Sequence, residues 1–181
     1  MDKPTVLDSR EIYRGRIFHV SLATVKEGET VYTREIIWHP GSAVIVPLFA
    51  DQTVALVRQY RHPASKYLLE LPAGSLSENE DPEAGARREL EEEIGVTAGK
   101  VEKLTEFYVS PGFLAEKMHL FLATDLTKTQ QNLEDDEILS IERLPLQAIP
   151  NLILEGKLED AKTIIGLTLT AARYGIHLTL K

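Results

Sequence analysis

The stretch GSLSENEDPEAGARRELEEEIGV, residues 74–96, determines the fold expected around it and carries most of the information about function. Its acidic side chains are crowded, because eight of them lie between Glu78 and Glu93. Like charges this close destabilise a helix unless they face solvent or share a cation. Their spacing favours a shared cation.

A loop followed by one helix of about 13 residues is predicted for this stretch. Asp81 is a suitable N-cap and Pro82 suits the first helical position. Gly95 suits the left-handed conformation that ends many helices. The helix is therefore expected between Asp81 and Gly95.

One side of this helix carries carboxylates. Glu89, Glu92 and Glu93 are related by steps of three and four residues, which bring side chains together on a helix. Glu91 points elsewhere and is expected to be solvated. A neighbouring apolar stripe can pack on a core, and it consists of Ala86, Leu90 and Ile94.

A hard divalent cation such as Mg²⁺ takes oxygen ligands and would supply the missing positive charge. Gly74 precedes the acidic run, at a point where a backbone approaches a phosphate or a metal closely. Arg88 can pair with a loop carboxylate such as Glu80 and hold the loop against the helix. The alternative is an acidic helix face that only meets solvent.

Taken in order, these positions resemble the signature of the Nudix hydrolases. The signature consists of Gly74, five residues, Glu80, seven residues, Arg88-Glu89, the aliphatic Leu90, one residue, Glu92-Glu93, one residue, Gly95 and the aliphatic Val96. So many fixed positions make a chance match far less frequent than for a short glycine pattern. The resemblance implies a hydrolase, dependent on Mg²⁺ with Mn²⁺ as the alternative, that acts on a nucleoside diphosphate linked to another group.

Length and composition agree with a compact enzyme. A chain of 181 residues suits one domain with a small appendage, and a net charge of −8 argues against nonspecific binding of nucleic acid. The first residues lack the apolar core of a signal peptide, and the longest apolar stretch, near 43–50, is too short to cross a bilayer. Without cysteine there is no thiol chemistry. We expect no membrane association and a soluble, cytoplasmic protein.

The order of predicted elements is that of an α/β protein with a mixed sheet flanked by helices. Residues 1–40 alternate apolar and polar positions, which predicts a small antiparallel β extension before the main domain, 41–181. This order fits the α/β/α sandwich that the Nudix resemblance implies. Later strands are expected near 43–46, 53–57, 103–109, 117–123 and 138–141, a loop at 126–137, and helices at 146–156 and 160–173.

Further segments resemble the ADP-ribose pyrophosphatase branch of that family. Pro111, within Ser110-Pro111-Gly112, lies fifteen positions after Val96, where that branch has its proline. Relatives exchange an N-terminal extension of this size between subunits, so the resemblance implies a homodimer. It also implies ADP-ribose or a related nucleoside diphosphate sugar as substrate. GDP-mannose, a broad set of nucleotide sugars, and a non-catalytic nucleotide-sugar sensor remain alternatives.

The resemblance assigns roles to single residues. The metal ligands are expected to be Glu89, Glu93, Glu92 and the carbonyl of Ala73, and Glu92 also counts among the catalytic carboxylates. Bound cations would lower the pKa of an attacking water, which splits the diphosphate into two monophosphates. For ADP-ribose these are AMP and ribose 5-phosphate. The general base is expected in the acidic loop 134–137, with Glu137 as first choice and Asp135 as second; a solvated loop is the alternative.

Substrate contacts are expected from residues outside the acidic stretch. Arg61 resembles a phosphate-binding arginine, and a guanidinium can grip two phosphate oxygens. Glu116 could bind ribose hydroxyls, and Phe18 or Tyr13 could stack on the base. The complete expected substrate set is Arg34, Glu35, Arg61, Ser110, Pro111, Gly112 and Glu116. The five histidines show no zinc-like spacing.

Overall fold

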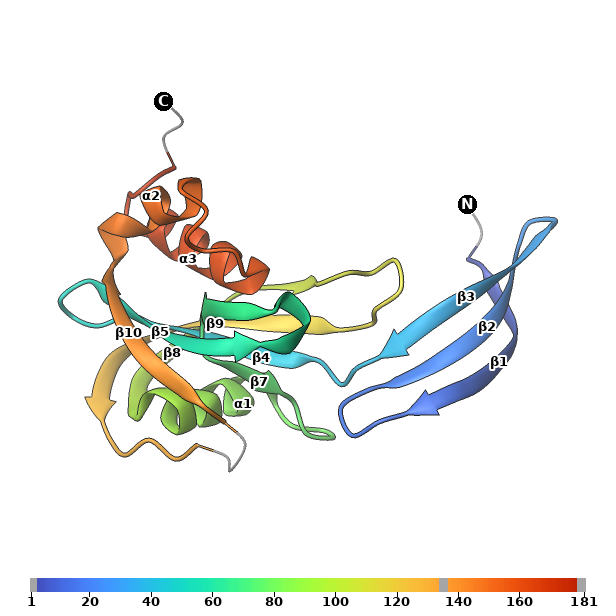
Figure 1. The fold of residues 1–181 in the computed structure, drawn as a ribbon, viewed down its shortest axis with the longest axis horizontal. Helices are drawn as coiled ribbons and strands as arrows, with labels where there is room; N and C mark the ends of the chain where they lie inside the picture. The colour runs from blue at the N-terminus through green and yellow to red at the C-terminus, as the bar shows by residue number, and fades with distance from the viewer. Residues whose placement is uncertain (1–2, 134–136, 179–181) are drawn as a thin grey trace.

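A computed structural model describes residues 3–133 and 137–178 of the chain as a core that carries a long N-terminal extension (Figure 1). The strands are β1 (Thr5–Arg14), β2 (His19–Glu27), β3 (Thr30–Trp38), β4 (Ser42–Pro47), β5 (Thr53–Arg61), β6 (Lys66–Glu70), β7 (Ala73–Ser75), β8 (Val96–Tyr108), β9 (Lys117–Lys128) and β10 (Leu139–Pro145). The α-helices are α1 (Pro82–Glu89), α2 (Ile149–Leu154) and α3 (Ala161–Arg173).

The strands form three sheets. The central sheet has the order β7-β4-β9-β8, and it is mixed because β4 pairs with β9 in parallel while its other pairs are antiparallel. A second, antiparallel sheet has the order β10-β5-β6, and the extension forms the third, β1-β2-β3. The predicted mixed sheet is therefore present, and a separate antiparallel sheet accompanies it.

Strand β4 lies at the centre of the core and is buried on both faces. Val44 and Val46 pack into one hydrophobic cluster with Leu167 of α3. Ala43 and Ile45 alternate with them and pack into another cluster, which includes the apolar stripe of α1. Figure 1 shows α1 on one side of the sheets and α2 with α3 on the other. The predicted α/β/α sandwich is confirmed.

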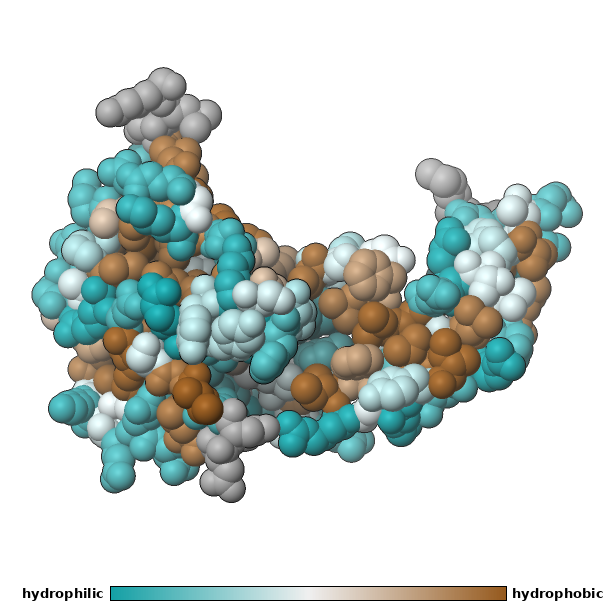
Figure 2. All heavy atoms as spheres, in the orientation of Figure 1, coloured by the Kyte–Doolittle hydropathy of each residue, from teal (hydrophilic) through white to brown (hydrophobic). Residues whose placement is uncertain are grey.

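The extension stands away from the core (Figure 1). All ten residues of β1 are exposed, and β2 buries only Ser21, Ala23 and Val25. Figure 2 shows hydrophobic residues gathered where the extension meets the core. Large apolar side chains remain exposed along it, namely Val6, Leu7, Ile12, Tyr13, Ile17, Phe18, Val31 and Trp38. Exposed apolar surface of this extent is typical of protein interaction faces.

Several element boundaries differ from the prediction because polar strand residues resemble loop residues in sequence. Strand β8 begins at Val96, directly after the helix, and β9 continues to Lys128, so the two strands make a long hairpin. Strand β6 was not predicted. The predicted helix at 146–156 is a 3₁₀ turn followed by the short α2. None of the helices in the described residues is long and apolar enough to cross a membrane.

Candidate functional site

The loop before α1 is ordered by short-range hydrogen bonds. The Asp81 carboxylate accepts from the backbone N–H groups of Glu83 and Ala84 at 3.0 and 3.1 Å, so it caps the helix as predicted. Glu80 accepts from the N–H of Ser77 at 2.8 Å. These contacts fix the loop against the helix start.

The helix predicted between Asp81 and Gly95 is interrupted, which corrects the expectation of one regular α-helix. Regular α-helix ends at Glu89, and Leu90–Ile94 form a π-helical turn that widens the backbone. Gly95 closes this turn with φ +70°, in the left-handed region predicted for it. Such π-turns inside helices occur frequently at functional sites.

Two carboxylates of the acidic stretch are buried inside the site. Glu89 is 6% exposed and Glu93 is 3% exposed. Glu93 Oε2 accepts from the backbone N–H of Ala73 at 3.2 Å, which brings the end of the helix against β7. A Cβ atom at Gly74 would lie 1.9 Å from Glu89 Oε1, so only glycine leaves room for this carboxylate.

Burial raises the pKa of both carboxyl groups. It is the largest cause at Glu89, whose pKa rises to about 7. At Glu93, burial and then the charge of Glu89 raise the pKa to about 8, against an ordinary value of 4.5. Nearby positive charge offsets this burial only in part, because Arg88 lowers the pKa of Glu89 and Lys162 lowers that of Glu93 without restoring ordinary values.

Arg88 supplies part of that positive charge. Its Nε donates to Glu80 at 3.0 Å, which confirms the predicted pairing of loop and helix. Its Nη1 also donates to Glu89 at 2.6 Å and to Glu92 at 2.9 Å. One guanidinium therefore holds three carboxylates, and Glu91 on the other side is exposed as expected.

The donor set fits a hard divalent cation, because carboxylate oxygens are the ligands such ions prefer. Glu93 and Glu89 face the same buried space beside β7, where burial raises the pKa of both carboxyl groups. Within residues 3–133 and 137–178, no three acidic or histidine side chains converge as a ready-made metal cage. In this arrangement Glu89 and Glu92 both pair with Arg88.

The expected general bases lie in a segment that is only partly described. Asp135 lies outside the described residues. Glu137 is half-buried, and its charge contributes to the raised pKa values of Glu89 and Glu93, after burial as the largest cause. The fold therefore brings Glu137 near the two buried carboxylates although about forty residues separate them in sequence.

Arg61, the expected phosphate-binding arginine, is paired with a buried carboxylate. Its Nε and Nη2 donate to the two oxygens of Glu70 at 2.7 and 2.8 Å. Glu70 is 1% exposed and also pairs with Lys162, a buried residue of α3. Sequence reasoning missed Glu70 and Lys162, because the contact joins residues 92 positions apart and no local pattern marks it.

A hollow of about 280 Å³ lies between the extension and the loop that follows β8. Arg34, Ile36 and Trp38 line it from β3, and residues 111–115 line it from the loop. The loop is fixed to β3 by two backbone hydrogen bonds at Ile37, of 2.8 and 2.9 Å.

Only some of the expected substrate residues lie in this hollow. Pro111 and Gly112 line it with Arg34, whereas Ser110 is not one of its lining residues, and the Ser110 carbonyl accepts from the N–H groups of Phe113 and Leu114. Glu35 follows Arg34 on the strand, so its side chain points to the opposite face. Arg34 and Glu35 of one chain therefore lie on different faces of β3, and their joint role in substrate binding stays a prediction.

Glu116 lies at the start of β9 in a polar cluster. Ser42 Oγ donates to Glu116 Oε1 at 2.7 Å, and His39 Nδ1 lies 3.8 Å from the same oxygen. His39 Nδ1 also accepts from the N–H of Gly41 at 3.1 Å. The other carboxylate oxygen of Glu116 makes no hydrogen bond within the described part of the chain, so it could accept from a ribose hydroxyl.

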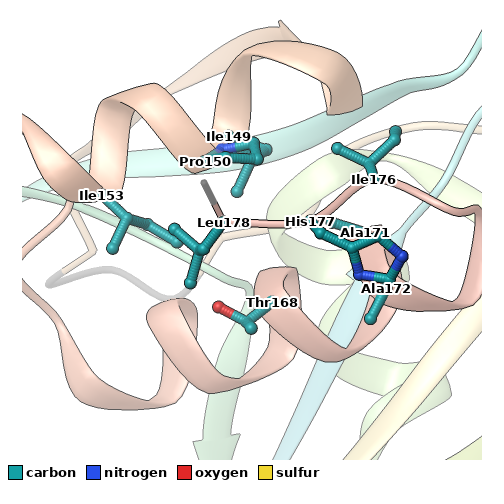
Figure 3. Close-up of a pocket in the computed structure, with 9 residues that line it drawn as sticks. All are labelled: Ile149, Pro150, Ile153, Thr168, Ala171, Ala172, Ile176, His177 and Leu178. Atoms are coloured by element: carbon teal, nitrogen blue, oxygen red, sulfur yellow. The ribbon is translucent and has the colours of Figure 1, made fainter. Parts of the chain in front are cut away.

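The two candidate stacking residues, Tyr13 and Phe18, contact each other with ring centroids 5.9 Å apart. Both are exposed on the extension. A separate hollow lies between α2, α3 and the end of the chain, as Figure 3 shows, and its lining is mostly apolar: Ile149, Pro150, Ile153, Thr168, Ala171, Ala172, Ile176, His177 and Leu178. None of the expected site residues reaches it.

The raised pKa values predict a pH-dependent stability of the metal-free protein. Unfolded glutamate ionises near 4.5, whereas Glu89 and Glu93 ionise near 7 and 8 in the fold. Between these values the folded protein binds more protons than the unfolded chain, so the free energy of unfolding falls as pH rises. In EDTA we expect the Tm of the wild-type protein to fall between pH 5 and pH 8. This fall should exceed that of Glu93→Gln by on the order of 5 °C. If calorimetry shows the same pH dependence of Tm in both proteins, the proposed destabilisation by the buried Glu93 charge is contradicted.

Comparisons with known proteins place this geometry among described families. The model of the NUDIX domain family matches residues 39–165. An ADP-ribose pyrophosphatase of Bacillus subtilis (strain 168) is 35% identical over 156 residues, which cover 84% of each chain. A methanol dehydrogenase activator of Bacillus methanolicus is 35% identical over 165 residues, covering 89% of each.

Two further similarities concern substrate and fold. A GDP-mannose pyrophosphatase of Yersinia pestis (strain Pestoides F) is 35% identical over 150 residues, covering 77% of this chain and 75% of that protein. A crystal structure described as an ADP compounds hydrolase aligns with a TM-score of 0.86 and 25% identity, covering 99% of this chain and 98% of that one. The alignment includes the N-terminal extension.

Proposed function

The chain belongs to the Nudix hydrolase family, and from that premise we propose that it hydrolyses the diphosphate of ADP-ribose or a related nucleoside diphosphate sugar. The observation that carries the proposal is the buried pair Glu89 and Glu93, with raised pKa values, beside β7. The similarity to an ADP-ribose pyrophosphatase over most of both chains supports this choice of substrate.

A divalent cation is the cofactor that the family generally uses, and we propose Mg²⁺, with Mn²⁺ as the alternative. Glu93, Glu89, Glu92 and the Ala73 carbonyl would hold it. When bound, such a cation offsets charge on the diphosphate and makes an attacking water more acidic. Hard oxygen ligands and the shortage of positive charge around the buried carboxylates both support this assignment.

The protein's own groups then position the reactants. Arg61 grips phosphate oxygens, and Glu137 takes the proton of the water that attacks one phosphorus. The P–O bond of the bridging oxygen breaks, that oxygen leaves with the other phosphate, and two monophosphates result. From ADP-ribose these are AMP and ribose 5-phosphate. Little covalent chemistry is required of the protein, because positioning and electrostatics dominate phosphoryl transfer.

We also propose that two copies of the chain associate through their extensions. The strand β1 exposes both faces, and large apolar side chains of β1 and β3 remain exposed in a single chain. Arg34 belongs to this extension and lines the hollow against residues 111–115. In a dimer, Arg34 and Glu35 of one copy would complete the substrate site of the other. A cytoplasmic location stays a prediction from the sequence.

Mixing two inactive variants tests the shared site. Arg34→Ala and Glu93→Gln each remove a group from a different part of it, so a mixed dimer contains one site with both groups intact. Random exchange of subunits should restore about a quarter of wild-type activity, because half of the dimers are mixed and each has one complete site. If the mixture stays as inactive as its components although light scattering shows dimers, the two groups act within one chain.

A panel of nucleoside diphosphate compounds assayed with Mg²⁺ tests the proposed activity. Release of AMP from ADP-ribose at the highest kcat/KM is the expected result. Higher kcat/KM for GDP-mannose would favour the second candidate, which the similarity to a GDP-mannose pyrophosphatase supports. Tight binding of ADP-ribose without release of monophosphate would reject hydrolysis and favour a nucleotide-sugar sensor.

A further inference from the structure

A buried charge network lies beside the carboxylate site, and Glu70 is its centre. Glu70 ends β6 and is 1% exposed. Arg61 binds both of its oxygens, and the ammonium of Lys162 binds Oε2 as well. Burial alone would raise the pKa of Glu70, but the two cations hold it below its ordinary value. Glu70 is therefore an ionised carboxylate inside the protein.

Lys162 is held in place from the start of α3. It is 7% exposed, and its Nζ also donates to Asp160 Oδ2 at 3.0 Å. Asp160 caps α3 by accepting from the N–H of Thr163 at 3.0 Å. The Thr163 hydroxyl accepts from the N–H of Leu71, the residue after Glu70, at 2.8 Å. The ammonium thus has a fixed position relative to the end of β6.

Arg61 keeps one edge of its guanidinium for another partner. Glu70 engages Nε and Nη2, and no hydrogen bond is made by Nη1 to any residue of the described ranges. The side chain of Arg61 is 42% exposed, although that of Glu70 is only 2% exposed. The pKa of Arg61 is raised first by its hydrogen bonds to Glu70 and also by the charge of Glu93. The chain itself joins the network to the carboxylate site, because Glu70 lies three positions before Ala73, whose N–H donates to Glu93 at 3.2 Å.

We propose that Lys162, through Glu70, is a positioning residue that aims the free edge of Arg61 at the phosphates of the substrate. If Glu70 were bound to Arg61 alone, its carboxylate would cancel the positive charge of Arg61 and leave the direction of the guanidinium unfixed. Because Lys162 binds the same carboxylate, it neutralises the charge of Glu70 from the buried side. Glu70 then has a fixed position from which it orients Arg61. Lys162 itself does not touch the substrate. This inference rests on the proposed function, because it deepens the role of Arg61 in the diphosphate site.

A double-mutant cycle of Lys162→Met and Arg61→Ala tests the inference. Loss of a directed cation should lower kcat/KM of Lys162→Met by on the order of 10-fold, and of Arg61→Ala by on the order of 100-fold. Because Lys162 acts through Arg61, adding Lys162→Met to Arg61→Ala should cost nothing more. Effects that multiply in the double variant would overturn the inference.

The matched control is Lys66→Met, which breaks the exposed pair of Lys66 with Glu159 between β6 and the segment before α3. It should leave kcat/KM unchanged, since exposed pairs contribute little. A loss equal to that of Lys162→Met would assign the effect to general loosening and contradict the inference. If Lys162→Met does not fold, Lys162→Gln, which keeps a donor and loses the charge, takes its place in the cycle.

The cycle also separates this inference from the proposed function. Hydrolysis by the wild-type enzyme tests the function, and the cycle is measured on the compound that it cleaves best. If the wild-type enzyme cleaves a compound but the effects of the two substitutions multiply, only the proposed role of Lys162 is contradicted. If no compound is cleaved, the proposed hydrolysis fails, and the same cycle on the binding of ADP, measured by calorimetry, still decides whether Lys162 acts through Arg61.

Discussion

Glu93→Gln is expected to lower kcat by on the order of 1,000-fold while the protein remains folded, since losing a ligand charge removes several kcal/mol of transition-state stabilisation. Glu93 is 3% exposed and its pKa is raised to about 8, mainly by burial. Glutamine has nearly the same volume, and its amide oxygen can still accept from the N–H of Ala73. The change therefore removes charge and little else.

The stability of this variant gives the expectation a second readout. Because the carboxylate is destabilising without a cation, metal-free Glu93→Gln should unfold at a higher temperature than the wild type at pH 8. Glu91→Gln is the matched control, since Glu91 is exposed on the same turn and should keep full activity. Wild-type rates in Glu93→Gln would refute its role as a ligand.

Gly74→Ala is expected to have the second largest effect, a loss of kcat/KM on the order of 100-fold, because misplacing a catalytic group by about 1 Å costs that much. The added Cβ would lie 1.9 Å from Glu89 Oε1. The atom it meets is the far end of a flexible side chain, so Glu89 can turn away and the backbone need not move. The expected lesion is a displaced ligand in a folded protein.

Titration calorimetry with Mn²⁺ checks this explanation directly. Gly74→Ala should bind the ion at least about 10-fold more weakly than the wild type, as expected for a disturbed ligand. Ser75→Ala is the matched control on the same strand, since it removes only a 3.4 Å contact with His39. Normal affinity for Mn²⁺ in Gly74→Ala would show that Glu89 does not need this space.

The parts of the site that the sequence predicted are those fixed by short-range contacts. Asp81 caps α1 through residues two and three positions later, and Arg88 reaches Glu80 across one loop. Gly95 has the left-handed conformation expected at a helix end. Such features depend on local spacing, which a single sequence contains.

The parts that could not be predicted depend on the tertiary fold. The pairing of Glu70 with Lys162 joins β6 to α3 across 92 residues. No local sequence pattern marks the π-turn at Leu90–Ile94, because the same acidic residues would also fit a regular α-helix. Strand β6 follows a polar turn, and its alternation of apolar and polar residues is too short to predict a strand.

Anomalous scattering from crystals grown with Mn²⁺ and ADP tests directly whether Glu93 and Glu89 bind a cation. We expect a peak within about 2.5 Å of oxygens from Glu93 and Glu89, the range for hard cations, beside the bound phosphates. Clear density for the nucleotide with no such peak, and with Arg88 still holding Glu89, would contradict this expectation.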